Sequence, residues 1–180
     1  MYEKEYHFEQ IRELFLIKMH SMTVKTALLK ENNIKIDERK NEVSFKDSNM
    51  KIDLGAIAKG YTSSKIIDIF KENNIKSGMV TLGGNLGKKP DGSLWKVGIQ
   101  NPIGEDEYLG VLQTSDKAVI TSGGYERNFT KNGKIYHHIL DPSNGYPANN
   151  GLTSVTIISS DGTLADALST SLFVMGKDKA

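Results

Sequence analysis

The chain has 180 residues, enough for one ordinary domain that buries roughly two thirds of its unfolded surface. Its 23 basic and 22 acidic residues give a net charge of +1, so no strong field attracts nucleic acid or an anionic membrane surface. No cysteine is present, which excludes disulfides, thiolate metal sites and a thiol nucleophile. The apolar run at 11–19 is interrupted by charged residues and is predicted to be neither a secretion signal nor a membrane span.

Three segments have apolar residues at the spacing of a helix. They lie at 6–29, 56–73 and 164–174. The second segment follows a predicted strand at 50–53 and a break at Gly55, so we expect a strand, tight turn and helix in succession.

Most of the remaining chain is predicted to be strand, because short β-branched and aromatic segments alternate with turn residues. The predicted strands lie at 34–37, 43–46, 50–53, 78–82, 94–99, 108–114, 117–120, 135–140 and 153–158. The first two form a hairpin, and the last is β-branched enough to be a central strand. Without repeats or linkers, this order favours a single α/β or α+β domain with a mixed, mostly antiparallel sheet flanked by helices, and of the two we predict α+β.

The stretch 121–147 mixes polar and aromatic residues too densely for a simple helix or strand period. We therefore expect a site there, on which the stretches 51–65 and 161–176 converge. His137 and His138 are consecutive in a strand-like segment, so their side chains should point to opposite faces and only one can enter a given pocket. For either residue, a half-buried structural histidine is the equally weighted alternative.

The last predicted helix carries oxygen ligands on one face. Asp166, Ser169 and Thr170 stand at i, i+3 and i+4, and such hard oxygen donors suit Mg²⁺. Spacing alone favours a capping box without metal, in which Thr163 is the N-cap and Asp166 its partner. The residues expected to pack this helix into the core are Ala165, Leu168, Leu172 and Met175.

Three further features are each open to two interpretations. Asp53, Gly55 and Lys59 lie at a strand-to-helix turn where a phosphate can bind, although a lone lysine is usually a solvated surface residue. The glycine-rich segment 83–87 can cradle phosphate or flavin, but a turn between strands is the commoner case. Asp141 before a proline can act in a site or simply accept local hydrogen bonds.

Six sequence blocks, in this order, resemble the FAD:protein FMN transferase family, often called ApbE. They are DLGAIAKGY at 53–61, GGN at 83–85, WKVGIQNP at 95–102, TSGGYERNF at 121–129, YHHILDPSNGYP at 136–147 and ADALSTSLFVMG at 165–176. The resemblance covers about residues 23–176 and implies an incomplete ApbE-like fold, truncated at both ends. It divides the chain into an unmatched, helical segment at 1–22 and a partial flavin transferase core at 23–180.

The resemblance implies an enzyme that cleaves FAD, attaches FMN to a Thr or Ser hydroxyl of a target flavoprotein and releases AMP with the help of Mg²⁺. It implies that His138 is catalytic and favours the metal interpretation of Asp166 over the capping box. The residues that it implies for FAD contact are Asp53, Lys59 and the backbone at Ile139 or Leu140, and those for Mg²⁺ are Asp166, Thr170, Ser169 and the Ala56 carbonyl.

These residue types suit the implied chemistry. A hydroxyl is a weak nucleophile that needs a base, which a neutral histidine can provide. Mg²⁺ with Lys59 would neutralise the charge that builds on the phosphate oxygens. Two alternatives remain, an FAD pyrophosphatase that gives FMN and AMP, and an inactive truncated remnant that binds flavin or metal. Family members often act outside the cytoplasmic membrane, but no signal or lipid-attachment cysteine is visible, so the compartment stays open.

Overall fold

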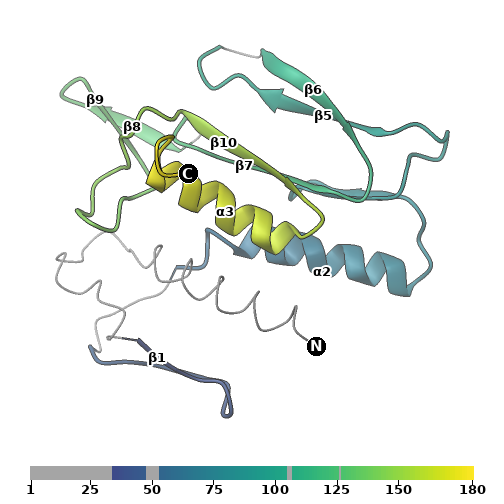
Figure 1. Ribbon diagram of the computed structural model, residues 1–180, viewed down its shortest axis with the longest axis horizontal. Helices are drawn as coiled ribbons and strands as arrows, with labels where there is room; N and C mark the ends of the chain where they lie inside the picture. The colour runs from purple at the N-terminus through teal and green to yellow at the C-terminus, as the bar shows by residue number, and fades with distance from the viewer. Residues whose placement is uncertain (1–33, 48–52, 105–106, 126) are drawn as a thin grey trace.

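The computed structural model describes residues 34–47, 53–104, 107–125 and 127–180 (Figure 1). Within them, the helices are α2 Ala58–Glu72 and α3 Gly162–Met175. The strands are β1 Ile34–Asp37, β2 Glu42–Phe45, β3 Gly78–Val80, β4 Gly84–Leu86, β5 Trp95–Gln100, β6 Tyr108–Thr114, β7 Ala118–Gly123, β8 Asn128–Lys131, β9 Lys134–His137 and β10 Ser154–Ser159. The segment 1–22, the predicted helix at 6–29 and nearly all of the predicted strand at 50–53 lie outside the described residues.

The centre of the described fold is a four-stranded sheet in the order β10-β7-β4-β3. Helix α3 packs on β7 and β10, helix α2 packs on β3 and β4, and the two helices contact each other on the same side of the sheet (Figure 1). The strands β1–β2, β5–β6 and β8–β9 form separate hairpins. Every pairing between described strands is antiparallel, which confirms the α+β domain predicted from the sequence.

The start of helix α3 differs from the predicted capping box. Asp161 is the N-cap, and its carboxylate accepts hydrogen bonds from the backbone N–H groups of Thr163 and Leu164 at 2.8 and 3.1 Å. Asp166 instead accepts a hydrogen bond from the N–H of Gly60 in helix α2 at 2.8 Å. The predicted box is therefore wrong, because the carboxylate of Asp166 joins two helices rather than starting its own.

The two helices cross at a pair of glycines. A Cβ atom on Gly60 would overlap the carbonyl oxygen of Gly162 and lie 2.6 Å from the Cβ of Asp166. Such contacts are closer than side chains tolerate, so this crossing requires glycine at position 60. The close approach is what allows Asp166 to reach the backbone of helix α2.

The buried face of helix α3 also differs from the predicted stripe. Ala165 is fully buried, but Leu168 and Leu172 are half-buried and Met175 is 44% exposed. The buried positions further along the helix are Asp166, Ala167, Ser169, Thr170, Ser171 and Phe173. Small and hydroxyl side chains occupy this face because the helix packs closely on both the sheet and helix α2.

Three strand predictions need correction. The segment 83–87 is not only a loop, since it contains β4, a buried inner strand between β3 and β7. Strand β10 lies at one end of the described sheet, whereas the inner position that was predicted for 153–158 belongs to β7. Strand β8 was not predicted, and it pairs with β9 across a tight turn at Asn132 and Gly133.

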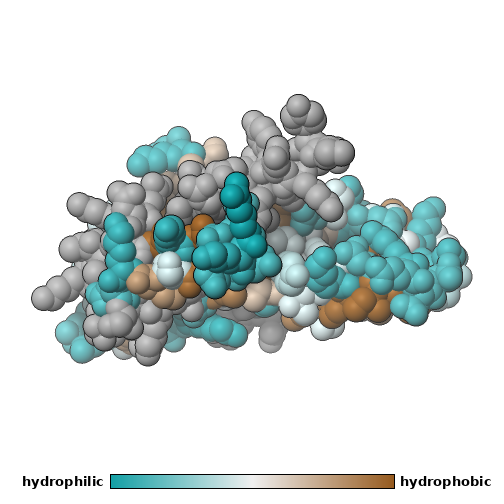
Figure 2. Space-filling model, turned by 90° about the horizontal axis from the view of Figure 1, so that it is seen from below, coloured by the Kyte–Doolittle hydropathy of each residue, from teal (hydrophilic) through white to brown (hydrophobic). Residues whose placement is uncertain are grey.

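None of the described helices is long and apolar enough to cross a bilayer. On the face seen from below, hydrophilic residues surround separate hydrophobic areas (Figure 2).

Candidate active site

A cavity of about 350 Å³ opens where strand β7 and the segment after β9 meet the two helices. Its walls are formed by Asp53, Gly55, Ala58, Lys59, Thr121, Ser122, Gly123, Arg127, His138, Ile139, Leu140, Asp166 and Thr170. The three stretches 51–65, 121–147 and 161–176 all contribute to it, which confirms their predicted convergence.

The wall from helix α3 is held by hydroxyl contacts with strand β7. Asp166 is only 2% exposed, and Thr170 lies one turn further along the same face. The Ser122 hydroxyl lies 2.9 Å from the Thr170 hydroxyl and 2.8 Å from the Ser169 hydroxyl. Ser169 donates to the carbonyl oxygen of Asp166 at 2.9 Å and does not line the cavity, because its side chain lies in the interface between helix and sheet.

The wall from helix α2 begins with a tight turn. The Asp53 carboxylate accepts a hydrogen bond from the Gly55 N–H at 2.6 Å, and both Asp53 and Lys59 are exposed at the cavity. The N-cap residue of helix α2, Ile57, makes no side-chain capping hydrogen bond. Instead, the Asp166 carboxylate of helix α3 accepts the Gly60 N–H in the first turn of helix α2, where the helix dipole favours a negative charge. Ala56 lies between lining residues but does not line the cavity.

The two consecutive histidines face different cavities, as predicted. His138 follows β9 directly, lines the 350 Å³ cavity and places Nδ1 3.4 Å from the carbonyl oxygen of Arg127. His137 lines a second cavity of about 550 Å³ on the other face of the hairpin. Its Nε2 lies 3.1 Å from the Ala148 carbonyl oxygen, and its ring meets Phe173 edge-on with centroids 5.6 Å apart.

The segment that carries His138 is anchored on both sides. Ile139 is 2% exposed and its carbonyl oxygen accepts the Ala148 N–H at 3.0 Å, while Leu140 bridges to Pro147. Asp141 accepts hydrogen bonds from the N–H and hydroxyl of Ser143 at 2.8 and 2.7 Å, which confirms the local interpretation of that residue.

The polar residues of the cavity wall that were not singled out from the sequence are Thr121, Ser122 and Arg127. All three lie within the block TSGGYERNF, so their neighbourhood was predicted but their individual positions were not. The predicted strand ended at residue 120, whereas β7 continues to Gly123. The Ser122 hydroxyl contacts helix α3, and Thr121 bonds to Thr156 of β10, hydroxyl to hydroxyl, at 2.8 Å.

The profile of the ApbE family matches residues 10–180. The chain belongs to the ApbE family. The match reaches into the segment 1–22, and the boundary predicted at residue 23 stays a prediction.

Two curated relatives share the name FAD:protein FMN transferase. The protein from Klebsiella pneumoniae (strain 342) is 38% identical over 154 residues, which cover 85% of this chain and 48% of the relative. The protein from Treponema pallidum (strain Nichols) is 40% identical over 150 residues, which cover 77% of this chain and 41% of the relative. The chain therefore spans about half the length of the curated relatives that it matches.

Solved ApbE structures share the fold. The crystal structure of the ApbE protein from Thermotoga maritima has a TM-score of 0.75 and 40% identity, covering 95% of this chain and 52% of that one. The apo form of the Pseudomonas stutzeri flavinyl transferase ApbE has a TM-score of 0.69 and 32% identity, and the match covers 86% of this chain and 48% of that one.

The 350 Å³ cavity offers oxygen donors rather than a preformed metal cage. Among the described residues, no group of three or more His, Cys, Asp or Glu side chains is placed to hold a metal ion. The wall instead presents the Asp166 carboxylate and the Thr170 hydroxyl on one helix face. Mg²⁺ takes few protein oxygens and completes its octahedron with water or phosphate, so this donor set is compatible with Mg²⁺.

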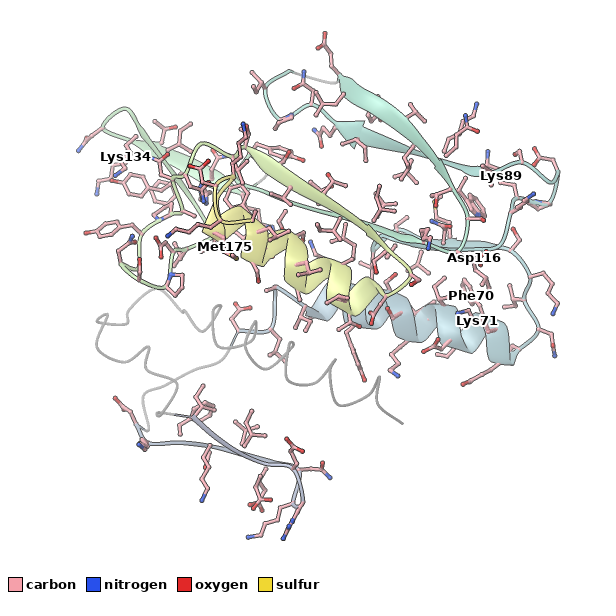
Figure 3. All side chains as sticks on the ribbon, in the orientation of Figure 1. Phe70, Lys71, Lys89, Asp116, Lys134 and Met175 are labelled. Carbon is pink, nitrogen blue, oxygen red and sulfur yellow. The ribbon has the colours of Figure 1, made fainter. Side chains whose placement is uncertain are left out.

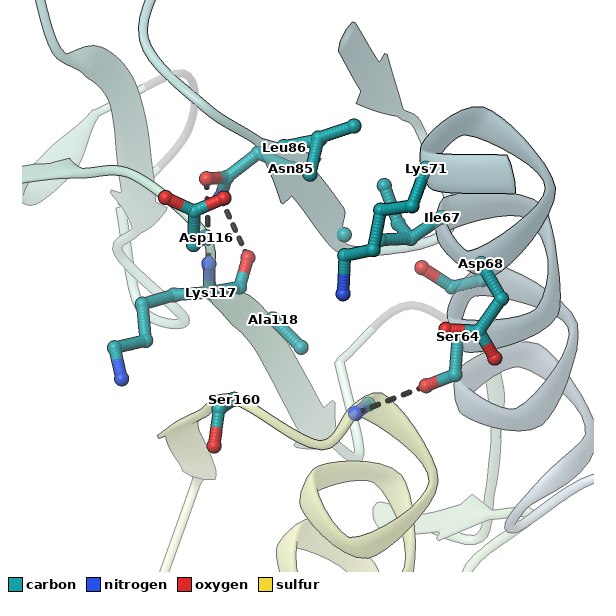
Figure 4. Close-up of a pocket in the computed structure, with 13 residues that line it drawn as sticks. Ser64, Ile67, Asp68, Lys71, Asn85, Leu86, Asp116, Lys117, Ala118 and Ser160 are labelled. Atoms are coloured by element: carbon teal, nitrogen blue, oxygen red, sulfur yellow. Dashed lines mark hydrogen bonds between the residues drawn. The ribbon is translucent and has the colours of Figure 1, made fainter. Parts of the chain in front are cut away.

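A smaller cavity of about 70 Å³ lies between helix α2, strand β4 and the start of helix α3 (Figure 4). Its polar groups are largely engaged with each other. The Asn85 amide donates to the Lys117 carbonyl at 2.6 Å, and the Ser64 hydroxyl accepts the Gly162 N–H at 3.1 Å. Ser63 is buried without a hydrogen-bond partner in the described part of the chain. This volume suits about two water molecules and excludes a nucleotide.

Proposed function

We propose that the chain catalyses the Mg²⁺-dependent transfer of FMN from FAD to a Thr or Ser hydroxyl of a target flavoprotein, releasing AMP. The observation that carries the proposal is that one 350 Å³ cavity brings His138 together with Asp166, Thr170 and Lys59. Its volume is within the range of small-molecule sites. The names of the curated relatives support flavin transfer as the reaction type.

In the proposed reaction, His138 accepts the proton of the acceptor hydroxyl. The hydroxyl oxygen bonds to the FMN phosphorus of FAD, the bond to the bridging pyrophosphate oxygen breaks, and AMP leaves with the electron pair. A neutral imidazole can accept a proton from a hydroxyl, which is the general-base role required here. His138 is exposed at the mouth of the cavity, where a protein-bound hydroxyl can approach it.

The other residues have binding roles in the proposal. Asp166 and Thr170 hold Mg²⁺, which supplies neutralising charge for the phosphate oxygens when bound. Ser169 and the Ala56 carbonyl are proposed to help hold the ion; neither lines the cavity, and the Ser169 hydroxyl donates to the Asp166 carbonyl oxygen. The residues proposed to contact FAD are Asp53, Lys59, Ile139 and Leu140, which all line the cavity.

A second candidate function is hydrolysis of FAD to FMN and AMP. The exposure of His138 favours it, because water can reach the same base in place of an acceptor hydroxyl. In that reaction the oxygen of a water molecule bonds to the FMN phosphorus and AMP leaves with the bridging oxygen, so no flavin becomes linked to protein.

The test is incubation of the chain with FAD, Mg²⁺ and a flavin-free acceptor domain that contains the target threonine. Gel fluorescence after denaturation measures protein-linked flavin, and chromatography measures free FMN and AMP. We expect acceptor-linked flavin with equimolar AMP. Free FMN with AMP, without acceptor-linked flavin, would show that the chain hydrolyses FAD rather than transferring FMN. If no product forms while a full-length relative is active in the same assay, both functions are contradicted.

A further inference from the structure

The hairpin β8–β9 carries a row of basic and aromatic side chains that begins at the active-site cavity. Cross-strand pairing places Phe129 opposite Tyr136 and Lys131 opposite Lys134. Because side chains alternate between faces along a strand, these pairs share a face with Arg127 and His138, which line the cavity. We call this face the basic strip, formed by Arg127, Phe129, Lys131, Lys134, Tyr136 and His138.

The strip is ordered by ring and cation contacts within the hairpin. The rings of Phe129 and Tyr136 stack with centroids 5.3 Å apart and planes 9° apart, and the Lys134 ammonium lies 5.7 Å from the Tyr136 ring centroid. The turn at Asn132 and Gly133, with φ of 53° and 73°, is a tight hairpin turn that fixes this register. The strip is therefore preorganised.

The strip is also exposed and positively charged. Phe129 is 61% exposed, and Lys134 lies at the outer end of the hairpin (Figure 3). The segment 127–138 contains no acidic residue in a chain whose overall charge is only +1. Within the described residues, neither Lys131 nor Lys134 forms an ion pair. Exposed aromatic side chains and arginine are enriched at protein interfaces, and exposed lysines add a positive charge that can attract an acidic partner.

We propose that the basic strip is the docking surface for the acceptor flavoprotein, and that it selects acceptors with acidic side chains next to the modified hydroxyl. This inference rests on the proposed function. When the hydroxyl of an acceptor reaches His138, the acceptor surface around that hydroxyl must contact the residues that border the cavity mouth, and these include the basic strip. The Phe129–Tyr136 pair lies about 7 Å beyond His138 along the hairpin and the lysine pair about 14 Å beyond it, from the rise of a strand. Charge complementarity therefore favours an acidic partner.

The test reverses the outer charges with Lys131→Glu and Lys134→Glu in one variant. The matched control is Lys88→Glu with Lys96→Glu, which makes the same change of net charge at exposed lysines that do not line the active-site cavity. Binding of a flavin-free acceptor domain is measured directly without FAD, and KM values for acceptor and FAD are measured separately. We expect the strip variant to weaken acceptor binding roughly tenfold and to leave the KM for FAD unchanged, while the control variant binds normally.

A charge swap makes the test specific. Changing the acidic residues beside the acceptor hydroxyl to lysine should restore binding to the strip variant and weaken binding to the unmodified chain. Equal acceptor binding by strip and control variants would overturn the proposal. A raised KM for FAD with unchanged acceptor binding would also overturn it, by assigning the strip to the nucleotide. Strip-dependent acceptor binding without flavin transfer would uphold the docking surface and reject the proposed enzymatic function.

Discussion

The adjacent residues His137 and His138 have different environments, because consecutive side chains of a strand point to opposite faces. His137 is fixed by the Ala148 carbonyl and by the edge of Phe173, so its ring is part of the packing behind the hairpin. His138 extends from the end of β9 into the active-site cavity. A catalytic role requires contact with the reacting atoms, so the proposal assigns it to His138, which lines the same cavity as Asp166, Thr170 and Lys59.

Replacing His138 by alanine is expected to lower kcat for flavin transfer by about 10²- to 10⁴-fold, the usual contribution of a general base. The matched variant His137→Ala should keep most of its kcat and instead lower the free energy of unfolding by about 1 to 2 kcal/mol, because it loses a hydrogen bond and a ring contact. Steady-state kinetics and urea unfolding of both variants separate the two effects. Similar losses of kcat in the two variants would show that the assignment to His138 is wrong.

Sequence patterns located most helices and strands, but they did not predict which elements pack against each other. Helix α3 was predicted at 164–174 and spans Gly162–Met175, because apolar spacing is a property of the helix alone. Its cap and its buried face were wrong, because they depend on Asp161 and on the close crossing at Gly60. Strand β8 was missed although Asn132 and Gly133 form a strong hairpin signal, since its own residues do not alternate in hydropathy.

The observed packing of helix α3 changes which residue matters most for stability. Phe173 is 1% exposed and packs with Ile139 and Ala148, so Phe173→Ala should lower the free energy of unfolding by about 3 to 5 kcal/mol. Leu172 belonged to the predicted core stripe but is only half-buried, so Leu172→Ala should cost less. Urea unfolding of both variants measures the difference. A larger loss for Leu172→Ala would contradict the observed orientation of the helix.

For the whole molecule, the site depends on segments that are distant in the sequence. The motif blocks predicted that 51–65, 121–147 and 161–176 meet, and the cavity is built from all three. The sequence did not predict that Ser169 faces the sheet while Thr170 faces the cavity, or that Arg127 joins the wall. Those facts depend on how the helix and the hairpin are rotated against the sheet, which only tertiary packing decides.

Because the site links three segments, a ligand that fills it should stabilise the whole fold. FAD with Mg²⁺ at about 100 times its dissociation constant is expected to add about 2.7 kcal/mol to the free energy of unfolding, and so to raise the melting temperature. Asp166→Asn should abolish the Mg²⁺-dependent part of this gain. The asparagine oxygen can still accept the Gly60 N–H, so the crossing of the helices is kept while the charge is lost.

The matched control for Asp166→Asn is Asp68→Asn, which removes one carboxylate from the small cavity on helix α2. Melting curves of both variants are compared with FAD alone, Mg²⁺ alone and the two together. The Asp68 variant should respond like the unmodified chain, because its carboxylate is outside the active-site cavity. If Asp166→Asn also keeps the full Mg²⁺-dependent shift, Asp166 is a structural acceptor for helix α2 and the magnesium ion binds elsewhere.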